Sequence, residues 1–130
     1  MSYLEKKIQR LLCADGIIFE QEKLIQDLRN GFFRFDFYIP LMNTAIEING
    51  EQHYHRIKFF HKSEADFSKA QERDRQKIGY CLAHNIKLYC IPYWEIDHLL
   101  CAQDIFNDNF LVKSKFHNDF VWRQKNRDKS

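Results

Sequence analysis

Two neighbouring segments of alternating side chains constrain the fold of this chain more than any other feature. The first runs from Phe33 to Pro40, and the second runs from Thr44 to Asn49. Strict alternation is typical of a β-strand, because successive side chains of a strand point to opposite faces of the sheet. We therefore expect two strands that pair as neighbours through a turn at residues 40–43.

The polar faces of these strands carry acidic side chains. In the first strand, one face holds Phe33, Phe35, Phe37 and Ile39 and the other holds Arg34, Asp36 and Tyr38. A register that buries the apolar face can place Asp36 beside Glu47 of the second strand. Because two adjacent carboxylates repel each other, we expect a hard divalent cation with oxygen ligands between them.

Length and composition predict a single folded domain. The chain has 130 residues, of which 45% are hydrophobic and 12 are Phe, and these are enough to bury a core without disulfides or a structural metal. The formal net charge of +2 is too small to identify a partner. No apolar run is long enough to span a membrane, so we expect no membrane partner.

The remaining elements follow from helical spacing and turn signals. We expect helices at Tyr3–Ala14, Ser63–His84, Trp94–Leu100 and Ala102–Val112, and a strand at Ile86–Ile91. Residues 17–28 are ambiguous, with a short strand possible at 17–20 and a turn at Asn30-Gly31. A helix between strands favours a crossover, so the fold class is α/β, a single domain with a mixed central sheet flanked by helices.

The long predicted helix carries an acidic residue on its buried side. Its apolar stripe consists of Phe67, Ala70, Ile78, Cys81 and Leu82. Asp74 lies along this stripe, and a carboxylate facing inward needs a partner, which Lys77 can supply. Arg73 and Arg75 on the flanks are suited to phosphates. The alternative is a solvated lattice of helix charges.

Two further residues are candidates for chemistry. His53 follows Glu47 just past the strand, where an imidazole is suited to act as a general base or to position water. A surface histidine without a role is the alternative, and a structural zinc site is disfavoured because no cysteine lies at ligand spacing. Glu5 belongs to a capping box with Ser2, which needs no chemistry.

The cysteines and the C-terminus indicate cellular context. The four cysteines Cys13, Cys81, Cys90 and Cys101 form no CxxC pair, and we interpret them as reduced core thiols of a cytoplasmic protein without a signal peptide. The segment from Lys113 to Ser130 is rich in Lys and Arg. It is suited to a phosphate polymer, or it is a frayed, solvated terminus.

The order of these residues resembles the PD-(D/E)XK nuclease superfamily. Asp36 followed by Glu47-Ile48-Asn49 resembles its pattern of an Asp at the start of a hairpin and an acidic residue on the next strand. Residues 46–54, 73–77 and 86–92 are more narrowly similar to the branch of very-short-patch-repair-like endonucleases and phage homing endonucleases with the EDxHD motif. The similarity spans roughly residues 2–97.

This resemblance implies a restriction-endonuclease-like core at residues 1–112, followed by a basic tail at 113–130. It implies hydrolysis of DNA by a water that Mg²⁺ activates, with Mn²⁺ as a substitute, in a bacterial or phage-infected cell. The implied metal ligands are Asp36, Glu47 and the Ile48 carbonyl. The implied catalytic residues are Glu5, Asp36, Glu47, Asn49, His53, Asp74 and Lys77. The implied nucleic-acid contacts are Arg34, Gln52, Arg73, Lys113, Lys115 and Arg123.

One departure from the family pattern opens alternatives. Asn49 occupies the position of the superfamily's lysine, so that role falls to His53, to Lys77 or to no residue. A noncatalytic nucleic-acid-binding module with the same fold is therefore the alternative function, and it predicts salt-dependent binding without cutting. A third reading is a structural subunit whose C-terminal aromatic residues pack on the body or on a second copy in a homodimer.

Overall fold

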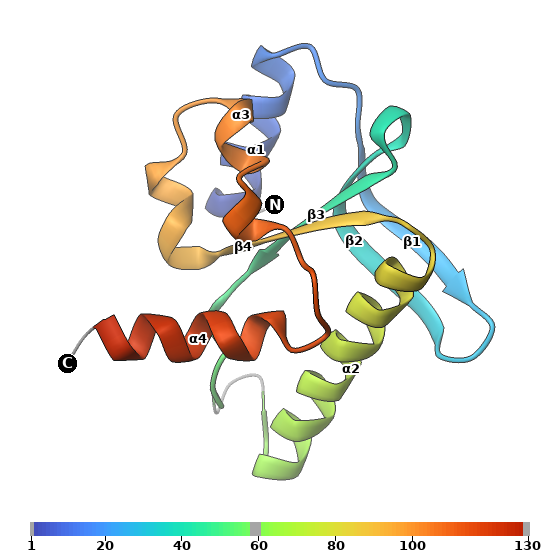
Figure 1. The fold of residues 1–130 in the computed structure, drawn as a ribbon, viewed down its shortest axis with the longest axis vertical. Coiled ribbons are helices and arrows are strands. Elements are labelled where there is room, and N and C mark those ends of the chain that lie inside the picture. Colours follow the sequence, from blue (N-terminus) through green and yellow to red (C-terminus); the bar gives the residue numbers. More distant parts are fainter. Residues whose placement is uncertain (1, 58–60, 129–130) are drawn as a thin grey trace.

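The computed structural model describes residues 2–57 and 61–128 and has a mixed α/β fold (Figure 1). Four strands form one sheet in the order β1-β2-β3-β4, with β1 at Glu20–Asp27, β2 at Gly31–Ile39, β3 at Thr44–Asn49 and β4 at Lys87–Pro92. The pairs β1–β2 and β2–β3 are antiparallel, and β3–β4 is parallel. The expected hairpin and the mixed sheet flanked by helices are confirmed.

The two longest predicted helices are also confirmed. α1 spans Tyr3–Ala14, and the Ser2 side chain caps it by accepting a hydrogen bond from the Glu5 N–H at 3.1 Å. α2 spans Glu64–Ala83 and connects β3 to β4 as a crossover, and Ser63 caps it in the same way at 3.1 Å. Each cap satisfies one of the backbone donors that a helix leaves unpaired at its start.

The sheet has a hydrophobic core on each face. One core joins the sheet to α1 and to the short helix α3 at Ala102–Ile105, and it includes Ile8, Leu12, Phe37, Ile46, Ile91 and Ile105. The other joins the sheet to α2 and includes Phe33, Phe35, Ala45, Ile78, Cys81, Leu88 and Cys90. Since successive residues of β3 and β4 enter different cores, these strands are covered on both faces, and five of the six residues of β3 are buried.

Strand β2 changes from one core to the other near Asp36. Phe33 and Phe35 pack with α2, whereas Phe37 packs with α1. The expected single apolar face is therefore wrong, although all four apolar side chains are buried. The change coincides with an irregularity in the pairing of β1 with β2. The register would place Glu22 opposite Asp36, but these two residues do not pair, and Glu22 has a left-handed φ of 50°. Asp36 thus lies at a local break in regular pairing.

Three other expected elements differ from the structure. The strand considered at residues 17–20 begins only at Glu20 and continues to Asp27, because pairing with β2 supplies the order that its own polar sequence does not predict. The helix expected at 94–100 is a 3-10 helix at Tyr93–His98. The helix expected at 102–112 ends at Ile105, and the Asn107 side chain then accepts from the Asn109 N–H at 2.9 Å and starts a new 3-10 turn.

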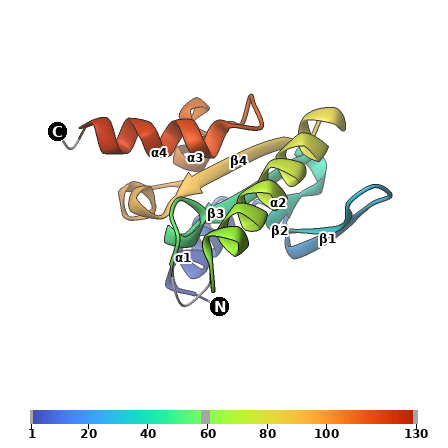
Figure 2. The ribbon, with the colours of Figure 1, turned by 90° about the horizontal axis from the view of Figure 1, so that it is seen from below.

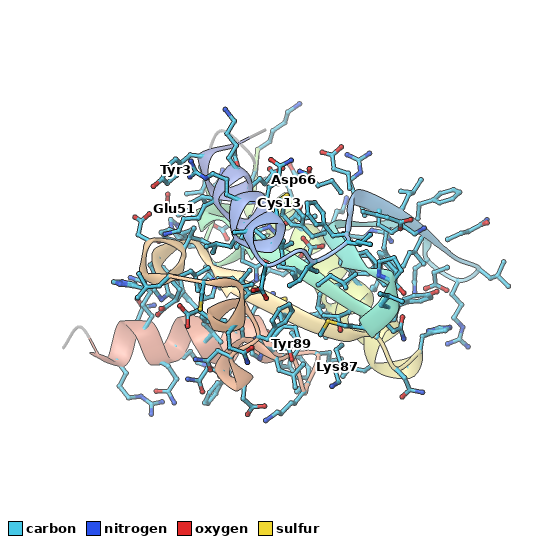
Figure 3. The ribbon with its side chains drawn as sticks, turned by 90° about the horizontal axis from the view of Figure 1, so that it is seen from above. Tyr3, Cys13, Glu51, Asp66, Lys87 and Tyr89 are labelled. Atoms are coloured by element: carbon cyan, nitrogen blue, oxygen red, sulfur yellow. The ribbon has the colours of Figure 1, made fainter. Side chains whose placement is uncertain are left out.

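Some side chains expected in the core are exposed. Leu82 of α2 is exposed, whereas its neighbour Cys81 is buried. Cys13, on α1 in Figure 3, and Cys101 are also exposed, and all four cysteines are free thiols. Helical periodicity defines a stripe only to within about one residue, and packing against the sheet decides where its margin lies.

A fourth helix, which the sequence did not predict, spans His117–Asp128 and is labelled α4. In Figure 2, β3 and β4 lie between α1 and α4. The Trp122 ring stacks on Tyr54 with centroids 5.4 Å apart, and Asp119 forms an ion pair with Arg75 of α2 at 3.1 Å. Residues 117–128 are therefore a packed helix and not a frayed terminus. In the part of the chain that the structure describes, no helix has the length and apolar character needed to cross a membrane.

Candidate active site

Most residues expected to carry chemistry line one pocket of about 490 Å³. It lies where the N-terminus of α1, the middle of β2, the end of β3 and the middle of α2 meet. Figure 3 shows Tyr3 of α1 and Glu51, which follows β3, on the same side of the molecule. The expected site residues in its wall are Glu5, Arg34, Asp36, Glu47, Ile48, Gln52, His53 and Lys77. The fold thus gathers groups that are as many as 72 positions apart in the sequence.

Asp36 is held by the backbone of the neighbouring strand. Regular pairing of β2 with β3 ends at Phe37 and Ile46, and a continued register would place Asp36 opposite Glu47. There the Asp36 Oδ2 atom accepts a hydrogen bond from the Ile48 N–H at 2.8 Å. The half-buried carboxylate is therefore fixed beside Glu47, as the alternation predicted.

Glu47 is buried and forms an ion pair with Lys77. The carboxylate is 8% exposed, and its Oε1 atom accepts a hydrogen bond from the Lys77 ammonium of α2. Burial raises the pKa of the Glu47 carboxyl well above its usual value; the Lys77 charge opposes this shift, and the Asp36 charge adds to it. Negative charge at Glu47 is therefore only partly compensated by the protein.

Lys77 keeps its proton in this arrangement. Burial lowers the pKa of its ammonium, but the charge and hydrogen bond of Glu47 outweigh burial, and the charges of Asp74 and Asp36 add to the same effect. The net direction is a raised pKa. Lys77 also donates to the Arg34 carbonyl at 2.7 Å, so its ammonium bridges strands β2 and β3. The site therefore contains a fixed cation among carboxylates.

His53 and Asp74 form a second pair beside the pocket. The Nδ1 atom of His53 lies 2.8 Å from Oδ2 of Asp74, and both side chains are 23% exposed. Because a carboxylate accepts, Nδ1 carries the proton and Nε2 is the basic nitrogen of the ring. Asp74 does face inward as predicted, but its hydrogen-bonded partner is His53 and not the expected Lys77, which reaches the sheet instead.

The residues present fit a hard divalent cation. Asp36, Glu47 and the Ile48 backbone provide oxygen ligands around one pocket, which is the ligand type that hard divalent cations prefer. Among the described residues, no cluster of three His, Cys, Asp or Glu side chains is arranged to hold a metal. Water and a substrate phosphate would therefore have to complete the coordination.

Other expected site residues lie elsewhere. Arg73 donates from its two terminal nitrogens to the carbonyls of Asn30 and Phe32 and lies over the Phe33 ring, so it ties α2 to the β1–β2 hairpin. Lys113 forms an exposed ion pair with Asp108 at 2.7 Å. None of Arg73, Lys113, Lys115 and Arg123 lines the pocket.

Asn49, at the position of the expected motif lysine, has a structural role. It is buried, and its Nδ2 atom donates to Oδ1 of Asn118 in α4 at 2.9 Å. No local sequence pattern points to Asn118, because it lies 69 positions from Asn49. The end of β3 is thus connected to α4 through a side chain that cannot carry charge.

Comparisons with known proteins add viral relatives. No protein-family model matches the chain. It is 39% identical over 67 residues to "Uncharacterized protein 307L" of Invertebrate iridescent virus 6, covering 50% of this chain and 34% of that protein. It is 42% identical over 59 residues to "Uncharacterized protein 094L" of Frog virus 3 (isolate Goorha), covering 45% and 38% respectively. The chain therefore spans little more than a third of the length of these relatives.

Proposed function

We propose that this protein is a metal-dependent endonuclease that hydrolyses phosphodiester bonds in DNA. The observation that carries the proposal is a single pocket lined by two carboxylates, a half-buried ammonium and a histidine whose partner Asp74 lies beside the pocket. This combination of anionic oxygen ligands, fixed positive charge and a proton acceptor is the set of groups that phosphodiester hydrolysis needs. The resemblance to PD-(D/E)XK nucleases supports the same assignment.

Asp36, Glu47 and the Ile48 carbonyl would hold Mg²⁺, which when bound polarises the scissile phosphate and lowers the pKa of a water molecule. His53 accepts the proton of the attacking water at Nε2, and Asp74 holds the ring and stabilises its charged form. Gln52 and Glu5 line the same pocket and can hydrogen bond to water there.

Lys77 takes the role of the motif lysine. It supplies from α2 the positive charge that Asn49 cannot supply from β3, and it lies within hydrogen-bonding distance of Glu47. A fixed cation at this place stabilises the negative charge that develops on the phosphate oxygens. Arg34, exposed at the same pocket, is placed to neutralise a neighbouring phosphate.

A catalytically inactive nucleic-acid-binding module is the second candidate. It is favoured by two observations: Lys77 already occupies one oxygen of Glu47, and the hydrogen bond to Asn118 commits Asn49 to holding α4. Such a module binds DNA in a salt-dependent manner and does not cut it.

A cleavage assay tests the proposal. Plasmid, single-stranded and branched DNA are incubated with the purified protein and Mg²⁺ or Mn²⁺, and Asp36→Asn is compared with Asp15→Asn, a change at an exposed residue at the end of α1. We expect EDTA and Asp36→Asn each to abolish cleavage, whereas Asp15→Asn retains it. Equal cleavage by the two variants rejects the assignment, and binding without cleavage supports the inactive module.

The viral relatives support a proposal for the biological setting. Both relatives are proteins of viruses, so we propose that the protein acts on DNA in a virus-infected cell. A bacterial or phage origin, as the sequence resemblance implied, and a homodimer stay predictions.

A further inference from the structure

A second pocket, of about 410 Å³, adjoins the candidate active site. His53 lines both pockets, and Tyr54, its neighbour in the chain, lines the second. The far wall comes from α4 and the residue before it, through Phe116 and Trp122. A substrate whose phosphate reaches His53 from the first pocket therefore has its adjacent portion next to the second.

The aromatic residues of this second pocket are suited to stacking. Phe116 is 49% exposed, although it is a large apolar side chain, and the Arg75 guanidinium and the Lys115 ammonium each lie 5.4 Å from its ring centroid. Trp122 is held in place by stacking between Tyr54 and His55, with ring centroids 5.4 Å away on each. One wall is thus a rigid aromatic surface, and the other is an accessible ring beside cations.

The charges of the pocket match a nucleotide. Arg75 and Arg123 contribute two guanidinium groups, and Asp119, the acidic residue in the wall, is paired with Arg75 at 3.1 Å. Guanidinium groups bind phosphate oxygens and stack on bases, and exposed aromatic rings stack on bases of any sequence.

We propose, on the basis of the function proposed above, that this pocket binds an unpaired nucleotide next to the scissile phosphate. A base within a duplex is stacked on both sides and paired along its edge, so it cannot enter such a pocket without being extruded. The substrate class is therefore DNA that contains a single-stranded or unpaired nucleotide at the cleavage position, with Phe116 as the stacking surface and Trp122 in the opposite wall.

Binding in the presence of EDTA tests this independently of hydrolysis. Three labelled oligodeoxynucleotides are compared by fluorescence anisotropy: a single strand, the fully paired duplex and the same duplex with one unpaired nucleotide. The variants are Phe116→Ala and Phe120→Ala; Phe120 is a matched control, because it is 54% exposed on α4 and does not line this pocket. Phe116→Tyr keeps a ring and should restore binding if the alanine variant acts through lost stacking.

We expect Phe116→Ala to weaken binding of the single strand and of the duplex with the unpaired nucleotide by about tenfold, and to leave binding of the paired duplex unchanged. Phe120→Ala should leave the binding of all three probes unchanged. An equal effect of Phe116→Ala on all three probes, or none on any, overturns the proposal. If cleavage depends on Asp36 but Phe116 has no effect, only the pocket assignment fails. If Phe116 matters but no DNA is cut with Mg²⁺, the pocket assignment stands and the hydrolytic function fails.

Discussion

The Lys77 ammonium of α2 and the Glu47 carboxylate of β3 form an ion pair. The Lys77 side chain is 18% exposed, and the Glu47 side chain is 8% exposed. The pair joins the long helix to the acidic centre of the sheet. Because Lys77 also donates to the Arg34 carbonyl, the same ammonium positions α2 against two strands. The proposed function and the stability of the fold therefore involve the same contact.

Removing one partner of this pair should destabilise the protein strongly. We expect Lys77→Met to cost about 3–5 kcal/mol of unfolding free energy, because it leaves a buried carboxylate without its cation. The double variant Lys77→Met/Glu47→Gln should recover much of that loss. Lys113→Met, which breaks an exposed pair with Asp108, should cost less than about 1 kcal/mol. Urea unfolding measures these variants and Glu47→Gln, and a loss in the double variant equal to the sum of the two single losses would contradict the coupling.

The raised pKa of Glu47 predicts a stability that falls with rising pH. The folded state holds the Glu47 proton more tightly than the unfolded state, whose carboxyl has the ordinary value of 4.5. This contribution is fully present below that pH and is lost as the pH rises through the folded pKa. As the pH rises above about 5, wild type should lose stability relative to Glu47→Gln. Parallel urea-unfolding profiles of the two proteins would exclude the shift.

Divalent cations should stabilise the folded protein through Asp36 and Glu47. A ligand that binds only the folded state raises the unfolding free energy by about 1.4 kcal/mol for each tenfold increase above its dissociation constant. We expect the melting temperature of wild type to rise with Mg²⁺ concentration and that of Asp36→Asn or Glu47→Gln to stay constant. Thermal scans with matched concentrations of NaCl separate binding from screening, and an identical rise in all three proteins would count against the site.

The His53–Asp74 pair predicts a graded loss of cleavage. If the proposed function holds, His53→Gln should lower the single-turnover rate by about 10²–10⁴-fold, because the proton acceptor is lost. Asp74→Asn should lower the rate less, since the ring nitrogen survives but loses its orienting carboxylate. His98→Gln is the control: His98 is exposed at the end of the 3-10 helix Tyr93–His98 and does not line the pocket. Comparable losses in His53→Gln and His98→Gln would remove the proposed role.

The left-handed backbone of Glu22 predicts a stabilising substitution. A non-glycine residue with a φ of 50° costs about 1 kcal/mol, and Glu22→Gly relieves that strain while increasing the entropy of the unfolded chain. We expect a net gain of up to about 1 kcal/mol. Glu20→Gly, at a neighbouring position of β1 without a positive φ, should instead destabilise. Chemical denaturation of both variants tests this, and a loss of stability in both would show that the conformation at Glu22 carries no strain.

Local pattern was sufficient to predict the hairpin of β2 and β3, both long helices and the parallel strand β4. Each has strong periodicity or clear end signals, such as Ser2 and Ser63 at the helix starts. It was insufficient for β1 and α4. The former is ordered by pairing with β2, and the latter by the stacking of Trp122 on Tyr54, contacts that no short window of sequence contains.

The sequence by itself determined which side chains of the hairpin are acidic and that Asp36 and Glu47 belong to adjacent strands, because alternation and a short turn leave little freedom in register. Only the tertiary structure decided the partners of these charges. Lys77 reaches Glu47, and Asp74 turns to His53, because a buried charge pairs with whichever group packing brings within reach. A charged group on α2 can pair either with a neighbour on the same helix or with a group from outside the helix, and the distance in the folded structure decides which pair forms.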